Sequence, residues 1–512
     1  MDLLTQFGDG LAAALTPANL MFAFAGVLIG TIIGILPGIG PITAIALLIP
    51  LSFGLEPAAG LVLMSGVYYG SMYGGSITSI LINTPGEVSH VATTLEGYRM
   101  GKNGRAGPAL ATSAIGSFIG GTLSVVALMF LATALAQVAV LFGAAEYTLL
   151  LILALAMTSS LSTGSKTKAF MSTLFGMAIA IVGIDGQTSV PRFTFGSLQL
   201  DSGIGFALVA MALFAIPEAL KNLAAGHTRP GEGVALQGRV WLNREDWRRS
   251  AGAYGRGSVI GFAAGLLPGL GPTLGSFMSY VAEKRFSKHK KEFDKDGAIE
   301  GVAGPESANN AGVGGAFVPM LALGIPGSAT TALLLFVFEM YGLQPGPLLF
   351  HDNATLVWTI IASMYVGNII LLVLNLPLVK VFVRLLQVPP PLLYTSVLAF
   401  TVLGAYALNF SLFSMVLLFI FGLAGYFMQR YDFPLAPAIL ALVLEPLLEK
   451  YFRQAIKSAG GDFTTFVDGP MAITLAALIV VGLILPPMIR VFRWGVRTAR
   501  NTDSRETESA SR

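Results

Sequence analysis

Long apolar stretches separated by short polar connections make up most of the chain between residues 18 and 489. An α-helix needs about 20 mainly apolar residues to cross a bilayer, and a transmembrane strand would instead alternate apolar and polar positions. The stretches do not alternate, so helices are expected throughout. They cover residues 18–49, 58–82, 108–130, 137–158, 168–186, 203–221, 254–283, 301–323, 354–376, 391–409, 411–428, 434–449 and 470–489. The pattern predicts an all-α polytopic membrane protein with about 10–12 spans.

The composition supports this class and excludes several others. Of the 512 residues, 54% are hydrophobic and 12% are charged, whereas a soluble protein carries about 25% charged residues. A chain this poor in charge is not expected to be a soluble enzyme or a nucleic-acid-binding protein. It has no cysteine, so disulfides, thiol nucleophiles and cysteine-ligated metals are excluded. No paired acid–base or nucleophilic set lies within a predicted span, so we expect neither an enzyme nor a bound cofactor or metal.

Two consecutive blocks of the sequence recur in the second half. Residues 26–41 read GVLIGTIIGILPGIGP and residues 257–272 read GSVIGFAAGLLPGLGP, while 74–86 read GGSITSILINTPG and 314–327 read GGAFVPMLALGIPG. Chance seldom aligns proline and glycine positions in two successive blocks, so we expect a duplicated chain. The expected parts are a first membrane repeat (1–225), a cytoplasmic connection (226–253), a second membrane repeat with an extra C-terminal span (254–490) and a polar cytoplasmic tail (491–512).

The distribution of charge indicates how the two repeats are oriented. Cytoplasmic loops collect Lys and Arg. Residues 284–295 contain six basic residues and the matching loop at 52–57 has none, whereas 99–105 contain three and the matching stretch 341–350 has none. Corresponding loops therefore favour opposite sides, which predicts inverted-topology repeats with a periplasmic N-terminus and a cytoplasmic C-terminus. This predicted topology leaves few basic residues on the non-cytoplasmic side of the membrane. They are Arg192, Lys450, Arg453 and Lys457.

Four Pro-Gly pairs interrupt the apolar stretches at matched places in the two halves. They are Pro37-Gly38, Pro85-Gly86, Pro268-Gly269 and Pro326-Gly327. Proline removes a backbone donor and glycine allows a sharp turn, so each pair predicts a broken helix or re-entrant hairpin. Such breaks survive at membrane depth only against protein or a wet cavity. Matched breaks favour a solute site between the repeats, and a packing kink without a ligand is the alternative.

Neutral polar side chains lie beside the breaks and extend the candidate substrate-binding set. They are Ser76, Thr78, Ser79, Asn83 and Thr84 in the first half, and Asn309, Asn310, Ser328, Thr330 and Thr331 in the second. Hydroxyls, amides and helix N-termini are suitable donors for carboxylate oxygens. Each hydroxyl could instead bond to the backbone of its own helix.

Glu306 lies within a predicted span, where an ionisable residue suggests function. It is our candidate for ion coupling, by binding Na⁺ or carrying a proton. The alternative is a carboxyl group at a helix start, bonded to local backbone N–H groups. We expect Glu87, His90 and Glu96 to lie nearer the membrane interface. Because no Lys or Arg lies clearly at mid-span, a bound polyanion would need a co-bound cation, which predicts symport with Na⁺ or H⁺.

A polar connection at residues 183–196 reads GIDGQTSVPRFTFG and is expected on the outer side. Asp185, Gln187 and Arg192 could form a docking or gating feature there, or merely an ordered loop. Both interpretations stay open at this stage.

Several motifs resemble those of one known family over roughly residues 15–490. They are GILPGIGP (34–41), YYGSMYGGSITSILINTPGE (68–87), VPRFTFG (190–196), AGPESANNAGVGGAFVPMLALGIPGSATTALLL (303–335) and YGLQPGP (341–347). Together they resemble the large membrane subunit of the tripartite tricarboxylate transporters. The resemblance implies a bacterial inner-membrane carrier for citrate or related organic acids, working with a small membrane subunit and a periplasmic solute-binding protein. A channel, or a carrier without a binding protein, is the alternative.

Overall fold

The computed structural model describes residues 3–162, 164–224, 234, 236, 240–269 and 271–481. The predicted cytoplasmic tail (491–512) and most of the polar part of the connection (226–239) lie outside the described residues. The described chain is helical except for loops and two short strands, β1 (Gly183–Ile184) and β2 (Pro191–Arg192), which pair antiparallel. The predicted all-α class is therefore confirmed.

The first half contains a core of helices that follow one another through two breaks. These are α1 (Leu3–Ala14), α2 (Pro17–Gly34), α3 (Pro41–Ser52), α4 (Pro57–Ile82), the 3₁₀ turn η1 (Val88–His90), α5 (Val91–Met100), the kinked turn η2 (Gly101–Arg105) and α6 (Ala106–Ala139). Proline begins α2, α3 and α4. A proline fits the first turn because the backbone N–H that it lacks would have no partner there.

The second half repeats this order of elements. Its core consists of α10 (Arg244–Gly265), α11 (Gly271–Phe286), α12 (Glu300–Leu323), α13 (Ala329–Met340), α14 (Leu349–Asp352) and α15 (Ala354–Asn375), followed by the short α16 (Val379–Val383) and η4 (Arg384–Gln387). In both halves a broken hairpin, α2–α3 or α10–α11, precedes a long helix, α4 or α12, that ends at a second break.

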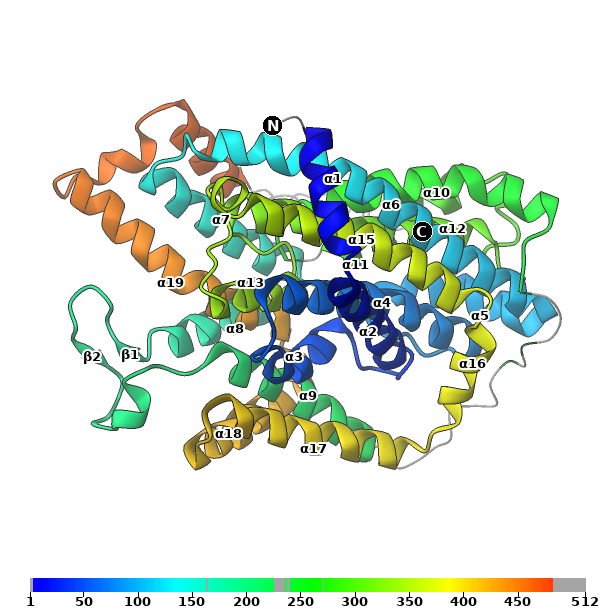
Figure 1. Ribbon diagram of the computed structural model, residues 1–512, viewed down its shortest axis with the longest axis horizontal. Helices are drawn as coiled ribbons and strands as arrows, with labels where there is room; N and C mark the ends of the chain where they lie inside the picture. Colours follow the sequence, from blue (N-terminus) through cyan, green and yellow to red (C-terminus); the bar gives the residue numbers. More distant parts are fainter. Residues whose placement is uncertain are drawn as a thin grey trace, which may run out of the picture.

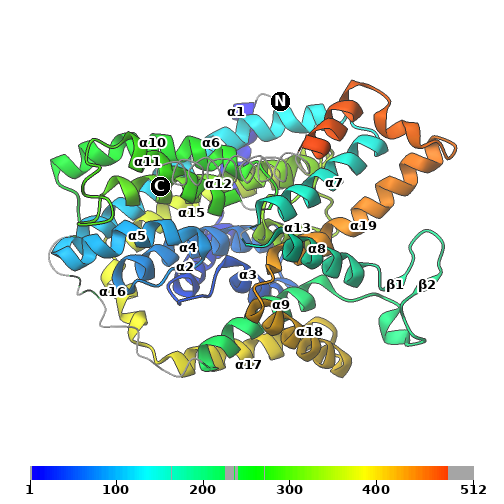
Figure 2. The ribbon, with the colours of Figure 1, turned by 180° about the vertical axis from the view of Figure 1, so that it is seen from behind.

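Two further groups of helices flank the core. They are α7 (Ala144–Leu161), α8 (Lys166–Ala180), η3 (Leu198–Leu200) and α9 (Phe206–Ala224) from the first half, and α17 (Pro390–Asn409), α18 (Leu412–Arg430), α19 (Leu435–Ser458) and η5 (Phe463–Val467) from the second. Each half contributes helices that pack on the other half: α9 packs on α17 and α18, and α19 packs on α7 and α8. Figure 1 shows α9, α17 and α18 along one edge of the molecule, and Figure 2 shows α7, α8 and α19 from behind.

Glycines hold the hairpin helices against the long helices in the same register in both halves. The faces of Gly26, Gly30 and Gly34 lie against the carbonyl groups of Leu63, Val67 and Ser71. In the second half, Gly257, Gly261 and Gly265 lie against the carbonyl groups of Gly304, Ala308 and Gly312. Corresponding glycines are 231 residues apart and corresponding carbonyl groups are 241 residues apart. Helix backbones approach this closely only when small residues lie between them.

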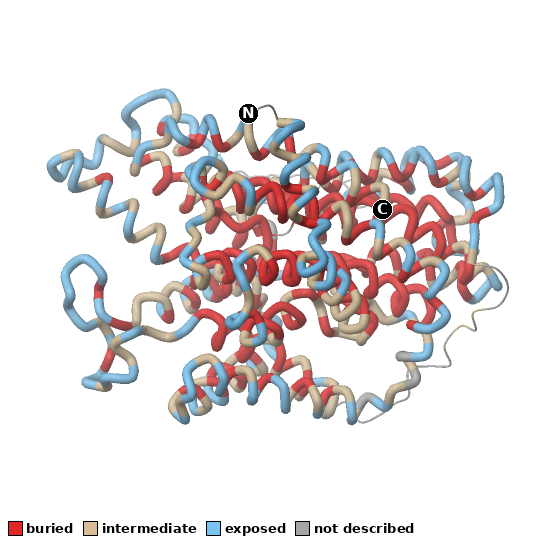
Figure 3. The backbone as a smooth tube through the Cα atoms, viewed as in Figure 1, coloured by how far each residue is buried: buried red, intermediate tan, exposed pale blue. Residues whose placement is uncertain are grey.

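The buried residues concentrate in the middle of the molecule, where α4 and α12 lie (Figure 3). Within the described residues, six helical segments are long and apolar enough to cross a membrane: α2, the continuous segment Val88–Ala139, α9, α15, α17 and α18. Shorter apolar helices include α3 and α13, which are parts of broken elements. The chain is thus a multi-pass membrane protein, and the number of 10–12 spans stays a prediction.

Candidate functional site

All four Pro-Gly pairs lie where a helix ends, as predicted. Gly38 and Gly269 have φ values of 77° and 108° at the tips of the α2–α3 and α10–α11 hairpins. Asn83 ends α4 with φ 57°, and Gly324 ends α12 with φ 71°. These are left-handed conformations that glycine and asparagine adopt more readily than other residues do. The local sequence therefore explains why each helix stops at its break.

In the first half, the two breaks lie directly against each other. A β-carbon placed on Gly86 would lie 2.8 Å from the carbonyl oxygen of Gly34 and 2.5 Å from the α-carbon of Gly75. A β-carbon on Gly40 would lie 3.4 Å from that of Glu87. The hairpin tip and the end of α4 thus form one cluster of closely packed backbone.

The second half builds the same cluster from the corresponding residues. A β-carbon placed on Gly327 would lie 3.0 Å from the carbonyl oxygen of Gly265 and 2.9 Å from the α-carbon of Ala316. In addition, the Gly269 N–H donates a hydrogen bond of 2.9 Å to the carbonyl of Gly327. The structure therefore brings together the paired breaks that the sequence predicts, separately in each half.

The long helices α4 and α12 connect the two clusters and run in opposite directions. The Tyr68 ring stacks on Phe317 with centroids 6.2 Å apart. Met72 lies further along α4 than Tyr68. His90 of η1 bonds the Met72 carbonyl at 2.7 Å and the Asn309 amide of α12 at 3.2 Å. Higher positions on α4 thus meet lower positions on α12, so the helices are antiparallel.

The first-half serine and threonine side chains bond within their own helix. Ser76 Oγ donates to the Tyr73 carbonyl, while Thr78 Oγ1 and Ser79 Oγ donate to the Gly75 carbonyl. All three are buried. These hydroxyl groups therefore bond to the backbone of their own helix, which was the alternative to binding a solute. Two further candidates from this half lie at the break itself, where Asn83 is exposed and Thr84 is half-buried.

The second-half serine and threonine candidates lie at the start of α13 and are buried. Ser328 Oγ accepts the Thr331 N–H at 3.2 Å, and the Ser328 N–H donates to Thr331 Oγ1 at 2.8 Å, which caps the helix. Thr330 lies beside them. The Ser328 hydroxyl also lies 3.3 Å from the Tyr68 hydroxyl on α4. This is the point where a break of one half meets a helix of the other.

Glu306 lies inside α12 and is fully buried, so the alternative of a carboxyl at a helix start is wrong. Its carboxylate instead accepts hydrogen bonds from two other helices, from Thr93 Oγ1 at 2.5 Å and from Ser117 Oγ at 3.2 Å. The nearby Asn309 and Asn310 side-chain oxygens have no hydrogen-bond partner among the described residues. Glu306 is therefore a buried acid whose carboxylate is held by two neutral hydroxyl groups.

The sequence did not single out the polar group that contacts the first hairpin tip. Glu218 on α9 lies against Gly38, and the Asn222 amide donates to its carboxylate at 2.7 Å. The Tyr394 hydroxyl on α17 donates to the Pro37 carbonyl at 2.7 Å. Glu218 lies within the predicted span 203–221, so the argument applied to Glu306 could have found it.

His90 lies inside the protein. It is 1% exposed and lies between α4 and α12. The expectation that it lies near the membrane interface stays a prediction.

Ion pairs hold the loop at 183–203, which contains the polar connection 183–196, to α19. Asp185 lies 2.7 Å from Arg453, and Arg192 lies 2.7 Å from Glu449. The backbone N–H of Gln187 and the Arg453 guanidinium keep the pKa of Asp185 well below its usual range. The expectation of an ordered loop agrees with these contacts, and a docking or gating role stays a prediction.

Comparison with known proteins identifies one family. Residues 20–440 match the family described as "Tripartite tricarboxylate transporter TctA family". A protein of Agrobacterium vitis, described as "Uncharacterized 52.8 kDa protein in TAR-I ttuC' 3'region", is 44% identical over 96% of this chain and 98% of its own. A second from the same organism, "Uncharacterized protein in TAR-II ttuC' 3'region", is 43% identical over 45% of this chain and 96% of its own. No solved structure matches.

Proposed function

The chain belongs to the tripartite tricarboxylate transporter TctA family, and we propose that it takes up tricarboxylates or related organic acids by symport with Na⁺ or H⁺. It would act as the large membrane subunit, together with a small membrane subunit and a periplasmic solute-binding protein. The single observation that best supports a solute site is the pairing of broken helices at corresponding positions in both halves.

We propose that the solute lies where the break at Pro326-Gly327, called the second break below, meets α4, close to Tyr68 and Ser328. Their hydroxyls are donors for carboxylate oxygens, and the N-terminus of α13 begins beside them. A helix N-terminus favours negative charge. Pro37, Gly38, Pro85, Gly86, Pro268, Gly269, Pro326 and Gly327 would shape this region through the backbone.

Glu306 is the proposed coupling residue. Small hard cations prefer oxygen ligands. The Glu306 carboxylate could supply one, and so could the side-chain oxygens of Asn309 and Asn310, which have no hydrogen-bond partner in the described part of the chain. A proton could equally be carried by the carboxyl group. Either cation would offset part of the negative charge of the solute.

The two halves would be related by inverted topology, which suits a carrier that opens to each side in turn. The antiparallel course of α4 and α12 and the matching glycine contacts support this relation. The family supports a location in the bacterial inner membrane. The charge distribution supports a periplasmic N-terminus and a cytoplasmic C-terminus.

Uptake into vesicles containing the purified complex tests this function. Labelled citrate and a panel of other organic acids should accumulate saturably only when a Na⁺ or H⁺ gradient is imposed. Full uptake without any ion gradient would contradict symport, and an ohmic current would instead indicate a channel. Undiminished uptake without the binding protein would favour the autonomous carrier.

A further inference from the structure

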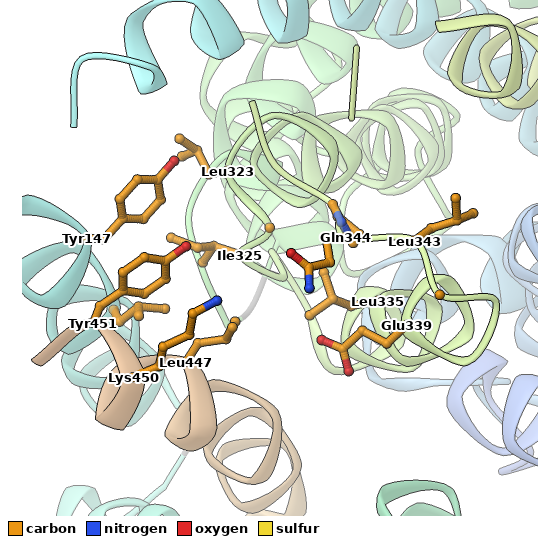
Figure 4. Close-up of a pocket in the computed structure, with 14 residues that line it drawn as sticks. Tyr147, Leu323, Ile325, Leu335, Glu339, Leu343, Gln344, Leu447, Lys450 and Tyr451 are labelled. Atoms are coloured by element: carbon orange, nitrogen blue, oxygen red, sulfur yellow. The ribbon is translucent and has the colours of Figure 1, made fainter. Parts of the chain in front are cut away.

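A cavity of about 210 Å³ adjoins the second break (Figure 4). Leu323, Gly324 and Ile325 form one wall, and the other walls come from α7, α19, α13 and the loop that follows α13. Because a water molecule occupies about 30 Å³ of liquid, the cavity has room for a small organic acid. It lies at the end of α12 that leads to Pro326-Gly327.

Charged and amide side chains line this cavity from opposite sides. The Lys450 ammonium group on α19 points into it, and the Gln344 amide and the Glu339 carboxylate lie on the facing side (Figure 4). A positively charged hydrogen-bond donor therefore faces a neutral amide and a negatively charged acceptor. The Tyr147 and Tyr451 rings stack beside Lys450 with centroids 4.8 Å apart and form a further wall.

Lys450 differs from Arg192 and Arg453 in having no acidic partner among the described residues. Arg192 and Arg453 are both paired with Asp185 and Glu449. The Lys450 ammonium group lies 5.5 Å from the centre of the Tyr451 ring instead. Its positive charge is thus free to attract an anion.

Lys450 also connects this cavity with two larger ones. It lines a cavity of about 690 Å³ beneath the connection at 183–203, and another of about 490 Å³ beside Lys457. All four basic residues that the charge pattern places outside line one or both of these larger cavities. An anion attracted to that surface would meet Lys450 before it reaches the second break.

We propose that Lys450 and Glu339 form an entry site for hydroxycarboxylic acids, on the periplasmic side of the second break. This proposal rests on the proposed uptake function. Lys450 donates to a carboxylate of the entering acid, and Glu339 accepts a hydrogen bond from its hydroxyl group. An acid without the hydroxyl leaves Glu339 without a donor and close to a second negative group. The site therefore prefers a hydroxy acid to its deoxy analogue.

Uptake kinetics of the complete complex in vesicles test the Lys450 part. Two matched pairs of labelled acids serve as probes: citrate with tricarballylate, and malate with succinate, each pair differing by one hydroxyl. Lys450→Met should raise KM about tenfold, as expected for loss of a hydrogen bond to a charged group, with little change in maximal rate. Lys450→Arg should keep most of the affinity, and Lys457→Met, which lies beside the third cavity, is the matched control.

The Glu339 part is tested by the ratio of the two KM values within a pair. The wild type should favour the hydroxy acid, and Glu339→Gln should reduce that preference at least about threefold by removing the repulsive charge. If wild-type protein transports neither pair, uptake of these acids is contradicted. If it transports a pair but Lys450→Met behaves like Lys457→Met, the entry site is overturned while the uptake function stands. An unchanged ratio in Glu339→Gln overturns the hydroxyl preference.

Discussion

The hydroxyl groups of Tyr68 and Ser328 lie 3.3 Å apart although 260 residues separate them in the sequence. Tyr68 belongs to the long helix of the first half, and Ser328 caps the helix that follows the last break of the second half. This contact joins one half of the protein to the broken helix of the other. It gives the proposed solute site two hydroxyl donors from different halves.

Removing the Tyr68 hydroxyl should weaken solute binding more than folding. Tyr68→Phe keeps the ring stacked on Phe317, so we expect KM for uptake to rise about tenfold, equivalent to a lost hydrogen bond of about 1.4 kcal/mol. Tyr69→Phe is the control, because the buried Tyr69 hydroxyl has no hydrogen-bond partner among the described residues. Equal KM values for the two variants would remove Tyr68 from the site.

The close glycine packing should make Gly265 intolerant of even one methyl group. A β-carbon there would lie 2.9 Å from the α-carbon of Gly315, so Gly265→Ala should destabilise the protein by about 1–3 kcal/mol through overpacking. Gly255→Ala in the same helix meets nothing within 4 Å and should be neutral or stabilising. Thermal unfolding in detergent measures both, and a similar Tm for the two variants would contradict the packing.

Glu306→Gln should separate solute binding from coupling. The amide keeps the shape of the side chain but cannot carry a proton or supply negative charge to a cation. We expect gradient-driven accumulation to fall at least about tenfold, as for loss of a charged partner, while exchange of solute across the vesicle membrane continues. Measurement of uptake against imposed Na⁺ and H⁺ gradients checks this, and an unchanged ion dependence would exclude Glu306 from coupling.

The loop at 183–203 should respond to pH through Asp185. Its pKa is lower in the folded protein than in the unfolded chain, so its stabilising effect is present above the ordinary aspartate pKa of about 3.9 and is lost as the pH falls through the lower folded value. The protection of the loop amides from hydrogen exchange, relative to their intrinsic exchange rate at each pH, should therefore be the same at pH 7 and pH 5. Asp185→Asn should increase exchange at both pH values, whereas Asp201→Asn, which forms no ion pair in the described residues, should not.

The sequence predicts the helix breaks well because their causes are local. Pro37, Gly38 and Asn83 each impose a backbone preference that no distant residue is needed to explain. The partners of side chains depend on tertiary structure instead. Ser79 bonds to its own helix, and Ser328 meets Tyr68, although both are hydroxyls beside a break.

Acidic residues show the same difference between local and distant causes. Glu306 could be recognised within an apolar stretch, but its Thr93 and Ser117 partners come from other helices and have no local pattern. The contact between Glu218 and Gly38 depends on how α9 packs against a hairpin tip. The sequence places Glu218 in a span, and only the fold shows what it contacts.

Protection of a single cysteine at the proposed solute site tests most directly whether solute binds where the helices break. The chain has no native cysteine, and Ser328 lies beside Tyr68 at the Pro326-Gly327 break, so Ser328→Cys can report on occupancy. A transported acid at ten times its Kd should slow modification of this cysteine by a small methanethiosulfonate about tenfold, by mass action. Glu56→Cys, exposed between α3 and α4, should react at the same rate with or without the acid. An unchanged rate at Ser328→Cys, in a variant that still transports the acid, would contradict a solute site at this break.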